Sequence, residues 1–324
     1  MMLGIDLGGT KIAYAVVAPG TATIRARLVT ETRSADGAAV VLSRMVEECR
    51  QVCAMAGIAP TDLTGIGVGV PGVFDDITGC TLFLPNLSGT WPGVPVVQMI
   101  AAALGCPVWL INDARAFVLA EAIHGAGRGA DNIVGFTLGT GIGGGVVIGR
   151  QLYLGIDGTA GEFGHQTLAL DGPRCGCGNK GCLEALASGP AIVARAQACV
   201  ERGEADQLAQ FIAAGQPFTP ALVATAAAAG DRALQRLMGD IYAAIGAGVA
   251  NVVTLFSPQV VVLGGSVSNL GEPLFAAVRA VVQERCRATP VARISIVPAV
   301  LGGNAGVLGA AQWAYQRALT GKEL

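Results

Sequence analysis

The chain has 324 residues, enough for about two domains, and 52% of them are apolar, so it can bury a sizeable core. Only 14% are charged, and 21 basic against 23 acidic side chains leave a formal net charge of −2. No basic tract stands out, which removes the electrostatic argument for a nucleic-acid partner.

The predicted elements alternate between strands and helices. The chain opens with a strand, a glycine turn and a second strand over residues 3–17, and a helix free of Gly and Pro is expected from Ala38 to Ala56. This alternation predicts an α/β fold. Further strands are expected over 65–74, 106–113, 133–149 (with a glycine loop inside), 259–267 and 293–299, and helices over 114–124, within 189–255 and from about Asn304.

Compartment and membrane association can also be judged from the sequence. The N-terminal segment lacks the charged and apolar regions of a secretory signal, so the nine cysteines are expected as free or metal-bound thiols in the cytoplasm. The least polar run, Ile241–Phe256, is interrupted by glycines and is shorter than the ~20 residues that span a bilayer. We therefore expect a buried helix there and no membrane partner.

Two segments repeat one plan. GIDLGGTKIAYAVV (4–17) and GFTLGTGIGGGVVIG (135–149) each read as a strand, a Gly/Thr turn and a second strand. Two half-chains with the same opening hairpin predict two similar lobes with a cleft between them. The boundary is expected soon after Asp113, before the hairpin plan restarts.

The glycine loops admit three interpretations. Gly139, Gly141 and Gly144 fit the dinucleotide pattern G-x-G-x-x-G, but a strand follows where that motif needs a helix, and no Walker A lysine follows either. Two structural hairpins are the plain alternative. Because glycine-rich turns can bind anions through backbone N–H groups, and Asp6 could hold Mg²⁺, we favour nucleotide phosphates as the ligand. The candidate residues are Asp6, Gly8, Gly9, Thr10, Lys11, Gly139, Thr140 and Gly141.

The segment RCGCGNKGCLE (174–184) holds three cysteines, and His165 precedes the first of them by ten residues. Three thiolates and one imidazole predict a closed, structural zinc site. A disulfide would leave an odd thiol, and a DNA-binding finger would need a basic helix that does not follow. The predicted ligands are His165, Cys175, Cys177 and Cys182.

Asp113 follows the apolar run CPVWLI at the end of a predicted strand. A carboxylate on such a rigid element could accept the proton of an attacking hydroxyl during phosphoryl transfer. The alternative is that Asp113 only caps the helix expected from Ala114.

Five motifs together resemble the ROK family of sugar kinases and repressors, in order and spacing, over essentially the whole chain. They are DLGGTK (6–11), IND (111–113), LGTGIGGG (138–145), GEFGH (161–165) and CGCGNKGCLE (175–184). The resemblance implies a two-lobed actin/hexokinase-like (ribonuclease H-like) fold. We expect a small lobe of residues 1–114 with 304–324 and a large lobe of 115–303 that carries the zinc-binding loop.

The resemblance implies an ATP-dependent hexose kinase of the glucokinase type, with Mg²⁺ and structural Zn²⁺. Asp113 resembles the general base of the family, and the GGS turn with Gly264 and Gly265 resembles its adenine-side loop, which favours ATP over polyphosphate. The residues that resemble the family's sugar contacts are Asn86, Asn112, Asp113, Glu162, His165 and Glu184.

Several functions stay open. The hexose could be glucose, mannose, fructose, allose or N-acetylmannosamine. A sugar-responsive repressor of the same family is the second possibility, although DLGGTK begins at residue 6, which leaves no room before it for a helix-turn-helix. A dehydrogenase is disfavoured by the strand after the second glycine loop. The resemblance also implies a homodimer or homotetramer.

Overall fold

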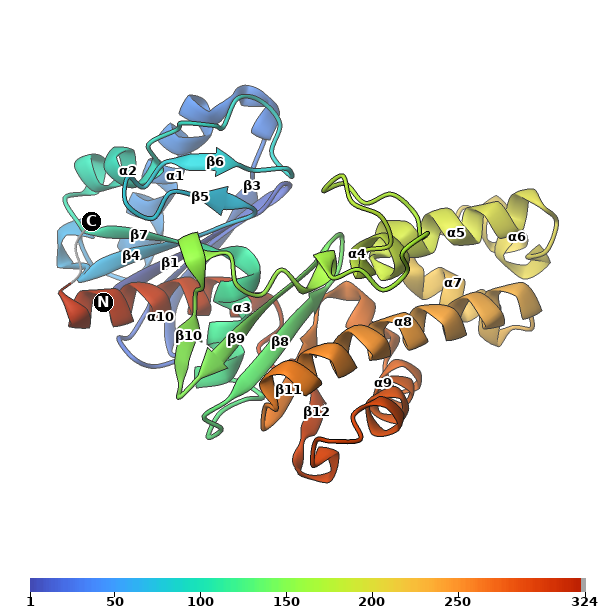
Figure 1. Cartoon of the computed structure of the whole chain (residues 1–324). Coiled ribbons are helices and arrows are strands. Elements are labelled where there is room, and N and C mark those ends of the chain that lie inside the picture. Colours follow the sequence, from blue (N-terminus) through green and yellow to red (C-terminus); the bar gives the residue numbers. More distant parts are fainter. Residues whose placement is uncertain (322–324) are drawn as a thin grey trace. The chain divides into compact units, whose positions relative to one another are not determined.

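The computed structural model describes residues 1–321 and shows the predicted alternation of strands and helices (Figure 1). Contacts divide the chain into two compact units. The first contains Met1–Gly129, Val146–Ala160 and Val300–Leu324, and the second contains Ala130–Gly145 and Gly161–Ala299. Our assignment of lobes as 1–114 with 304–324 and as 115–303 stays a prediction.

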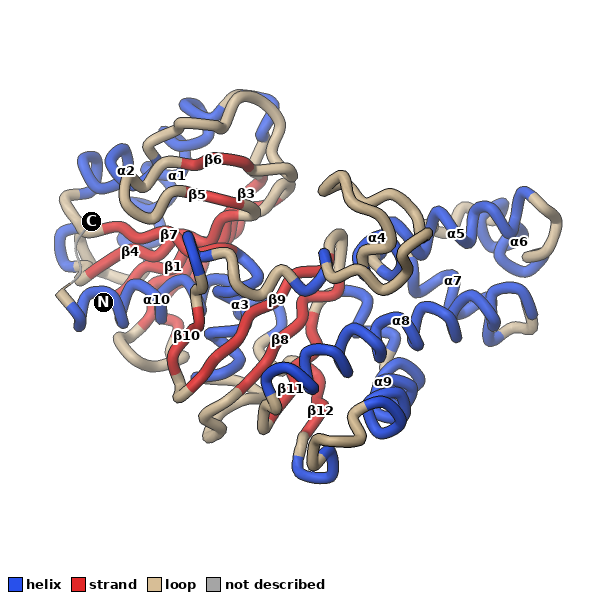
Figure 2. Tube along the Cα trace, in the orientation of Figure 1, coloured by secondary structure: helices blue, strands red, loops and turns tan. Residues whose placement is uncertain are grey.

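The first unit is built on a five-stranded sheet in the order β3-β2-β1-β4-β7. β1 pairs antiparallel with β2, as the opening hairpin predicted, and parallel with β4, which in turn pairs parallel with β7 (Figure 2). The chain returns to this sheet after the helix expected at Ala38. The strands are β1 (Met2–Leu7), β2 (Lys11–Val17), β3 (Ile24–Glu31), β4 (Gly65–Val70) and β7 (Val108–Asn112), and a separate hairpin joins β5 (Val73–Phe74) to β6 (Thr81–Phe83).

Helices complete two apolar cores in this unit. α1 buries Val41, Met45 and Cys49 at helical spacing in one core, so the paired cysteines Cys49 and Cys53 are packing residues. α3 and α10 contact each other and form the other core with Trp109 and Ile111. The helices are α1 (Ala38–Met55), α2 (Val96–Leu104), α3 (Asp113–Ile123) and α10 (Ala305–Thr320).

α10 lies unusually close to its neighbours because the contacts are made by glycines. A methyl group on Gly67 of β4 would overlap the backbone carbonyl of Ala310, and one on Gly4 of β1 would overlap that of Val307. On the helix itself, a methyl group on Gly309 would overlap the carbonyl of Ala116 in α3. Backbone atoms cannot yield as a side chain can, so only glycine fits at these positions.

The second sheet has the order β10-β9-β8-β11-β12 and repeats the topology of the first. β8 and β11 are parallel, as are β11 and β12, while β10 pairs antiparallel with β9. The sequence repeat therefore correctly predicted two sheets that open with the same hairpin. The strands are β8 (Ile133–Leu138), β9 (Ile142–Ile148), β10 (Gln151–Tyr153), β11 (Val260–Gly264) and β12 (Ser295–Pro298).

Helices of the second unit surround α8, which contacts α4, α5, α7 and α9. α8 is long and apolar enough to cross a membrane by length and composition, but it buries Ile241, Ile245 and Val249 within the protein, as a core helix does. The helices are α4 (Leu183–Ala187), α5 (Gly189–Glu201), α6 (Asp206–Ala213), α7 (Pro220–Ala228), α8 (Arg232–Phe256) and α9 (Glu272–Arg285). The 3-10 segments of the chain are Ser34–Asp36, Pro60–Asp62, Ile156–Gly158, Phe163–His165, Ser266–Leu270, Val291–Arg293 and Gly302–Asn304.

The glycine contacts of α10 generate a prediction about stability. Gly67→Ala should lower the free energy of unfolding by about 1–3 kcal/mol, because α10 must move away from β4. Gly239→Ala is the control: this helical glycine of α8 has no neighbour within 4 Å of an added methyl group, and the change should stabilise the protein by about 0.5–1 kcal/mol. Urea unfolding curves compare the two variants, and equal midpoints for Gly67→Ala and the parent would contradict the prediction.

Candidate active site and metal centre

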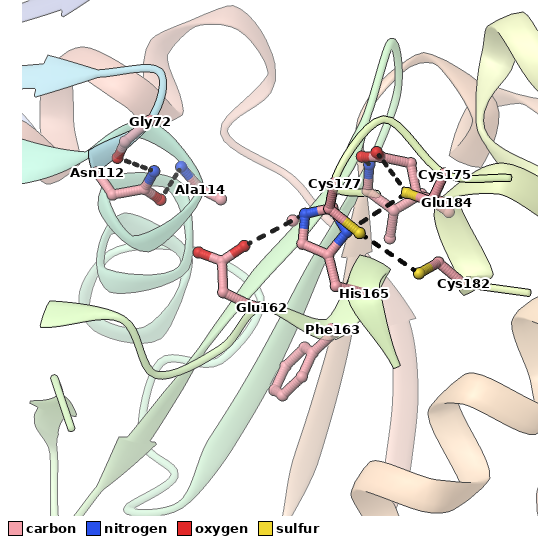
Figure 3. Close-up of polar contacts among 12 residues, drawn as sticks. Gly72, Asn112, Ala114, Glu162, Phe163, His165, Cys175, Cys177, Cys182 and Glu184 are labelled. Carbon is pink, nitrogen blue, oxygen red and sulfur yellow. Dashed lines mark hydrogen bonds and ion pairs between the residues drawn. The ribbon is translucent and has the colours of Figure 1, made fainter. Parts of the chain in front are cut away.

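The predicted zinc ligands converge in the second unit. Ligand atoms of His165, Cys175, Cys177 and Cys182 all lie within 4.8 Å of one another. Cys175 Sγ lies 3.7 Å from His165 Nδ1, and the sulfurs of Cys177 and Cys182 lie 3.7 Å apart (Figure 3). Three thiols from one short segment and the imidazole of His165, four possible ligands in all, thus surround a single point.

These separations fit a tetrahedral zinc ion. Bonds of about 2.3 Å to sulfur and 2.0–2.1 Å to nitrogen place neighbouring ligand atoms roughly 3.6–3.8 Å apart. No disulfide joins these cysteines, because a sulfur–sulfur bond is about 2.05 Å long and all three are free thiols. Four protein ligands leave no open position, so the ion would be structural.

The thiols differ in their tendency to ionise. Burial raises the pKa of Cys182 to about 12 and also raises the pKa of Cys175. A hydrogen bond from the backbone of Asn179 lowers the pKa of Cys177, the exposed member. Since a metal binds thiolates, loading the cluster must release protons from the buried pair.

Packing against β9 fixes the GEFGH motif. A methyl group on Gly164 would overlap the carbonyl of Ile142, and one on Gly161 would come within 2.7 Å of the Gly144 carbonyl. Phe163 between them is buried against Phe136, with ring centroids 4.8 Å apart. The motif is thereby held along the strand.

The packed motif presents His165 and Glu162 in a defined way. His165 directs Nδ1 toward the cysteines, while its Nε2 lies 3.8 Å from the carboxylate of Glu162 (Figure 3). The same imidazole can therefore serve the metal through one nitrogen and a polar group through the other.

Glu184 connects the cysteine cluster with the second glycine loop. Its Oε2 accepts a hydrogen bond of 2.8 Å from the N–H of Ile142, and its Oε1 lies 3.8 Å from Cys175 Sγ. A methyl group on Gly141 would come within 2.7 Å of the same carboxylate, so the glycine gives Glu184 its place. The sequence predicted a sugar contact for Glu184 but not this link.

The second glycine loop closes tightly on itself and on β11. The N–H of Gly139 donates to the carbonyl of Gly141 at 2.9 Å, and Thr140 lies exposed at the tip. Gly264 ends β11, and Gly265 follows with a positive φ of 89°, where an added methyl group would come within 2.7 Å of the Leu138 backbone nitrogen. The structure therefore brings the two predicted glycine segments of this unit together.

In the first unit, Asn112 and Asp113 mark the junction of β7 and α3. Asn112 is the N-cap: its Oδ1 accepts from the N–H groups of Ala114 and Arg115, and its Nδ2 donates to the carbonyl of Gly72 at 3.2 Å (Figure 3). Asp113 is the first helical residue, so Asn112, and not Asp113, occupies the N-cap position. Asp113 still accepts a hydrogen bond of 2.7 Å from the N–H of Ala114.

The first glycine loop is the turn between β1 and β2. The N–H of Gly8 donates to the carbonyl of Lys11 at 3.0 Å, and Thr10 and Lys11 are exposed. A methyl group on Gly9 would overlap the carbonyl of Asn86, so this turn and the predicted sugar contact lie together.

Asp6 ends β1 just before this turn. Burial raises the pKa of its carboxyl group, and the carboxylate makes no hydrogen bond or ion pair with any residue of the described range 1–321. Gly306 of α10 leaves room for it, since a methyl group there would overlap the carboxylate. A half-buried acid without a protein partner among these residues fits a bound cation such as Mg²⁺.

The sequence does not single out Glu121 of α3 as a candidate. Its carboxylate is fully buried and, among residues 1–321, accepts hydrogen bonds only from backbone N–H groups. These N–H groups lie five and about 180 positions away along the chain, and no side-chain pattern in the sequence predicts the contacts.

The repeated sheets and this arrangement of loops define an α/β protein with an actin-like fold, as the sequence predicted. The chain belongs to the ROK family, whose pattern matches residues 2–317.

Among curated proteins, a glucokinase from Thermotoga maritima is 34% identical over 98% of both chains. A putative xylose repressor from Caldicellulosiruptor is 33% identical over 76% of this chain and 61% of its own length. Among solved structures, a ROK hexokinase from Thermus thermophilus matches with a TM-score of 0.83 and 35% identity over 98% of this chain and 99% of its own. A ROK glucokinase from Streptomyces griseus, in complex with glucose and AMPPNP, matches with a TM-score of 0.79 and 33% identity over 97% and 99%.

The thiol pKa values predict how zinc binding responds to pH. Below the raised pKa of Cys182, metal must displace a proton, so zinc affinity should fall as pH falls, by up to about tenfold per unit for each proton released. Dialysis against a chelator at pH 6, 7 and 8, followed by metal analysis, should leave the least zinc at pH 6. Cys182→Ser should lose zinc at every pH, whereas Cys80→Ser, outside the cluster, should retain it. Equal zinc content in the two variants would rule out the four-ligand site.

Proposed function

We propose that this chain is an ATP-dependent hexose kinase that converts glucose to glucose 6-phosphate. The observation that carries the proposal is the junction of β7 and α3. There Asn112 occupies the N-cap, and Asp113 stands at the first position of a helix anchored on two neighbouring elements. Such a carboxylate can accept the proton of a sugar hydroxyl as it attacks the terminal phosphate.

The nucleotide is assigned to the two glycine turns. The N–H groups of Gly8 and Gly139 close their own turns, so the phosphates are assigned to the other N–H groups of residues 8–11 and 139–141 and to the cation of Lys11, with Gly264 and Gly265 on the adenine side. Asp6 would hold Mg²⁺, directly or through water, and the ion would neutralise charge on the phosphates when bound. The solved relative that contains glucose and AMPPNP supports ATP as the donor.

The proposed sugar contacts follow the family resemblance and are given for each unit by itself. They are Asn86, Asn112 and Asp113 in the first unit, and Glu162, His165 and Glu184 in the second. Zinc would contribute indirectly by holding the imidazole of His165, so that its Nε2 faces Glu162 and substrate hydroxyls. The similarity to a glucokinase over the full chain favours glucose over the other hexoses. We extend the proposal to a cytoplasmic homodimer or homotetramer.

A sugar-responsive regulator is the second candidate, because a xylose repressor is 33% identical to this chain. A regulator needs to bind the sugar but not to transfer phosphate. The orientation of Asp113 on a helix start would then have no chemical use, and sugar binding without ADP release would identify this case.

The proposed base generates the decisive test. Asp113→Asn should lower kcat by about 10²–10⁴, because general-base assistance contributes that much, while glucose binding changes little. A coupled ADP-release assay over glucose, mannose, fructose, allose and N-acetylmannosamine measures both activity and preference. Asp75→Asn is the control, since that carboxylate accepts hydrogen bonds within its own turn, from Ile77 and Thr78. Full activity in Asp113→Asn would remove it as the base.

A further inference from the structure

The carboxylate of Glu121 lies at the far end of α3 from Asp113. It is 0% exposed, and its oxygens accept three backbone hydrogen bonds. Oε2 accepts from the N–H of Ala126 at 2.9 Å, and Oε1 accepts from the N–H groups of Val300 and Leu301 at 3.0 and 2.8 Å. Within residues 1–321 no cation forms an ion pair with it.

Such a group is expensive to bury unless its oxygens are bonded. Hydrogen bonds to an ionised acceptor are about twice as strong as neutral ones, so three of them make the site stiff. The chain around it is shaped for this contact: the N–H groups of Gly125 and Gly127 donate to the Glu121 carbonyl at 3.1 and 2.9 Å. A methyl group on Gly125 would overlap the carboxylate.

The bonded segments have a special place in the chain. The longest stretch of the first unit ends at Gly129, three residues after Ala126, and its last stretch begins at Val300, with a middle stretch of Val146–Ala160 between them. Glu121 therefore holds the chain at the first and the last of its four crossings between the units. The side chain of Val300 is 65% exposed, so its backbone alone is held.

α3 is itself fixed on α10. His124 Nε2 lies 3.1 Å from Gln312 Oε1 just beyond the end of α3, and Ala116 packs against Gly309 in the middle. α3 thus carries the proposed base, Asp113, at its start and Glu121, which binds the two connections, near its end.

We infer that Glu121 is a positioning residue, which anchors these two connections to the helix that bears Asp113. Any rearrangement of the connecting segments is then confined to residues beyond the anchor, and the orientation of Asp113 is preserved during turnover. The effect on turnover rests on the proposed kinase function; the anchor itself does not.

The test compares two buried carboxylates of the first unit. Glu121→Gln replaces one accepting oxygen by an amide that faces N–H groups. Glu48→Gln is the matched control, because Glu48 is 8% exposed and bonded to the hydroxyl of Tyr14 in the α1 core, away from both connections. Both variants should lower Tm, and kinetics are measured well below both melting temperatures.

Glu121→Gln should lower kcat by about 10- to 100-fold with KM for the hexose within about twofold, because small misplacements of reacting groups cost this much. Glu48→Gln should keep the parental kcat. Hydrogen exchange should accelerate at amides 126, 300 and 301 in Glu121→Gln only. If both variants lose Tm and neither loses kcat, Glu121 is merely structural and the inference is wrong.

Hydrogen exchange of the parent protein tests the anchor in two further cases, a variant that does not fold and a parent without kinase activity. If Glu121→Gln does not fold, amides 126, 300 and 301 of the parent must still exchange as slowly as the core strands, and exchange at loop rates would overturn the anchor. If the parent phosphorylates no hexose, the kinase proposal fails, while the same exchange rates still decide whether the anchor exists.

Discussion

The direct contact of α10 with the first sheet is the constraint on which the first unit depends. Gly4 and Gly67 of the sheet let backbone meet backbone, and no larger residue could occupy these positions without displacing the helix. α10 in turn sets the position of α3, through Gly309, and leaves space for Asp6, through Gly306. The positions of Asp6 and Asp113, the two acids proposed for chemistry in this unit, therefore both depend on the close packing of α10.

In the second unit, polar contacts also hold the candidate site residues in position. Here the GEFGH motif packs along β9, and the cysteine segment is bound to the second glycine loop by Glu184. A zinc ion between His165 and the three thiols would lock the segment from the other side. Loss of the metal would then change the positions of the glycine loop and of Glu162, although neither is a ligand.

How far the sequence predicts this structure depends on how local the signals are. The hairpin repeat and the three-cysteine segment are contiguous, and both led to correct expectations about the sheets and the clustering of His165 with the thiols. β3 was not identified, since it is an outer strand of its sheet that alternates charged and apolar residues with much of its surface exposed. The sequence offered Asp113 and not Asn112 as the helix cap, because either side chain can accept the capping hydrogen bonds; in the structure Asn112 is the N-cap. Glu121 was invisible because its partners are backbone groups brought together only by the fold.

Two acids of the first unit show how packing separates structure from chemistry. Glu121 is fully buried and Asp6 is half-buried, and in both places an ionised carboxylate is costly unless it is compensated. Three N–H groups compensate Glu121 fully, so its charge is already satisfied by the protein. Asp6 has no such donors among the described residues, and burial raises its pKa. A bound cation would offset that cost, because it favours the ionised form of Asp6. We therefore expect a metal–nucleotide complex to bind at Asp6 and not at Glu121.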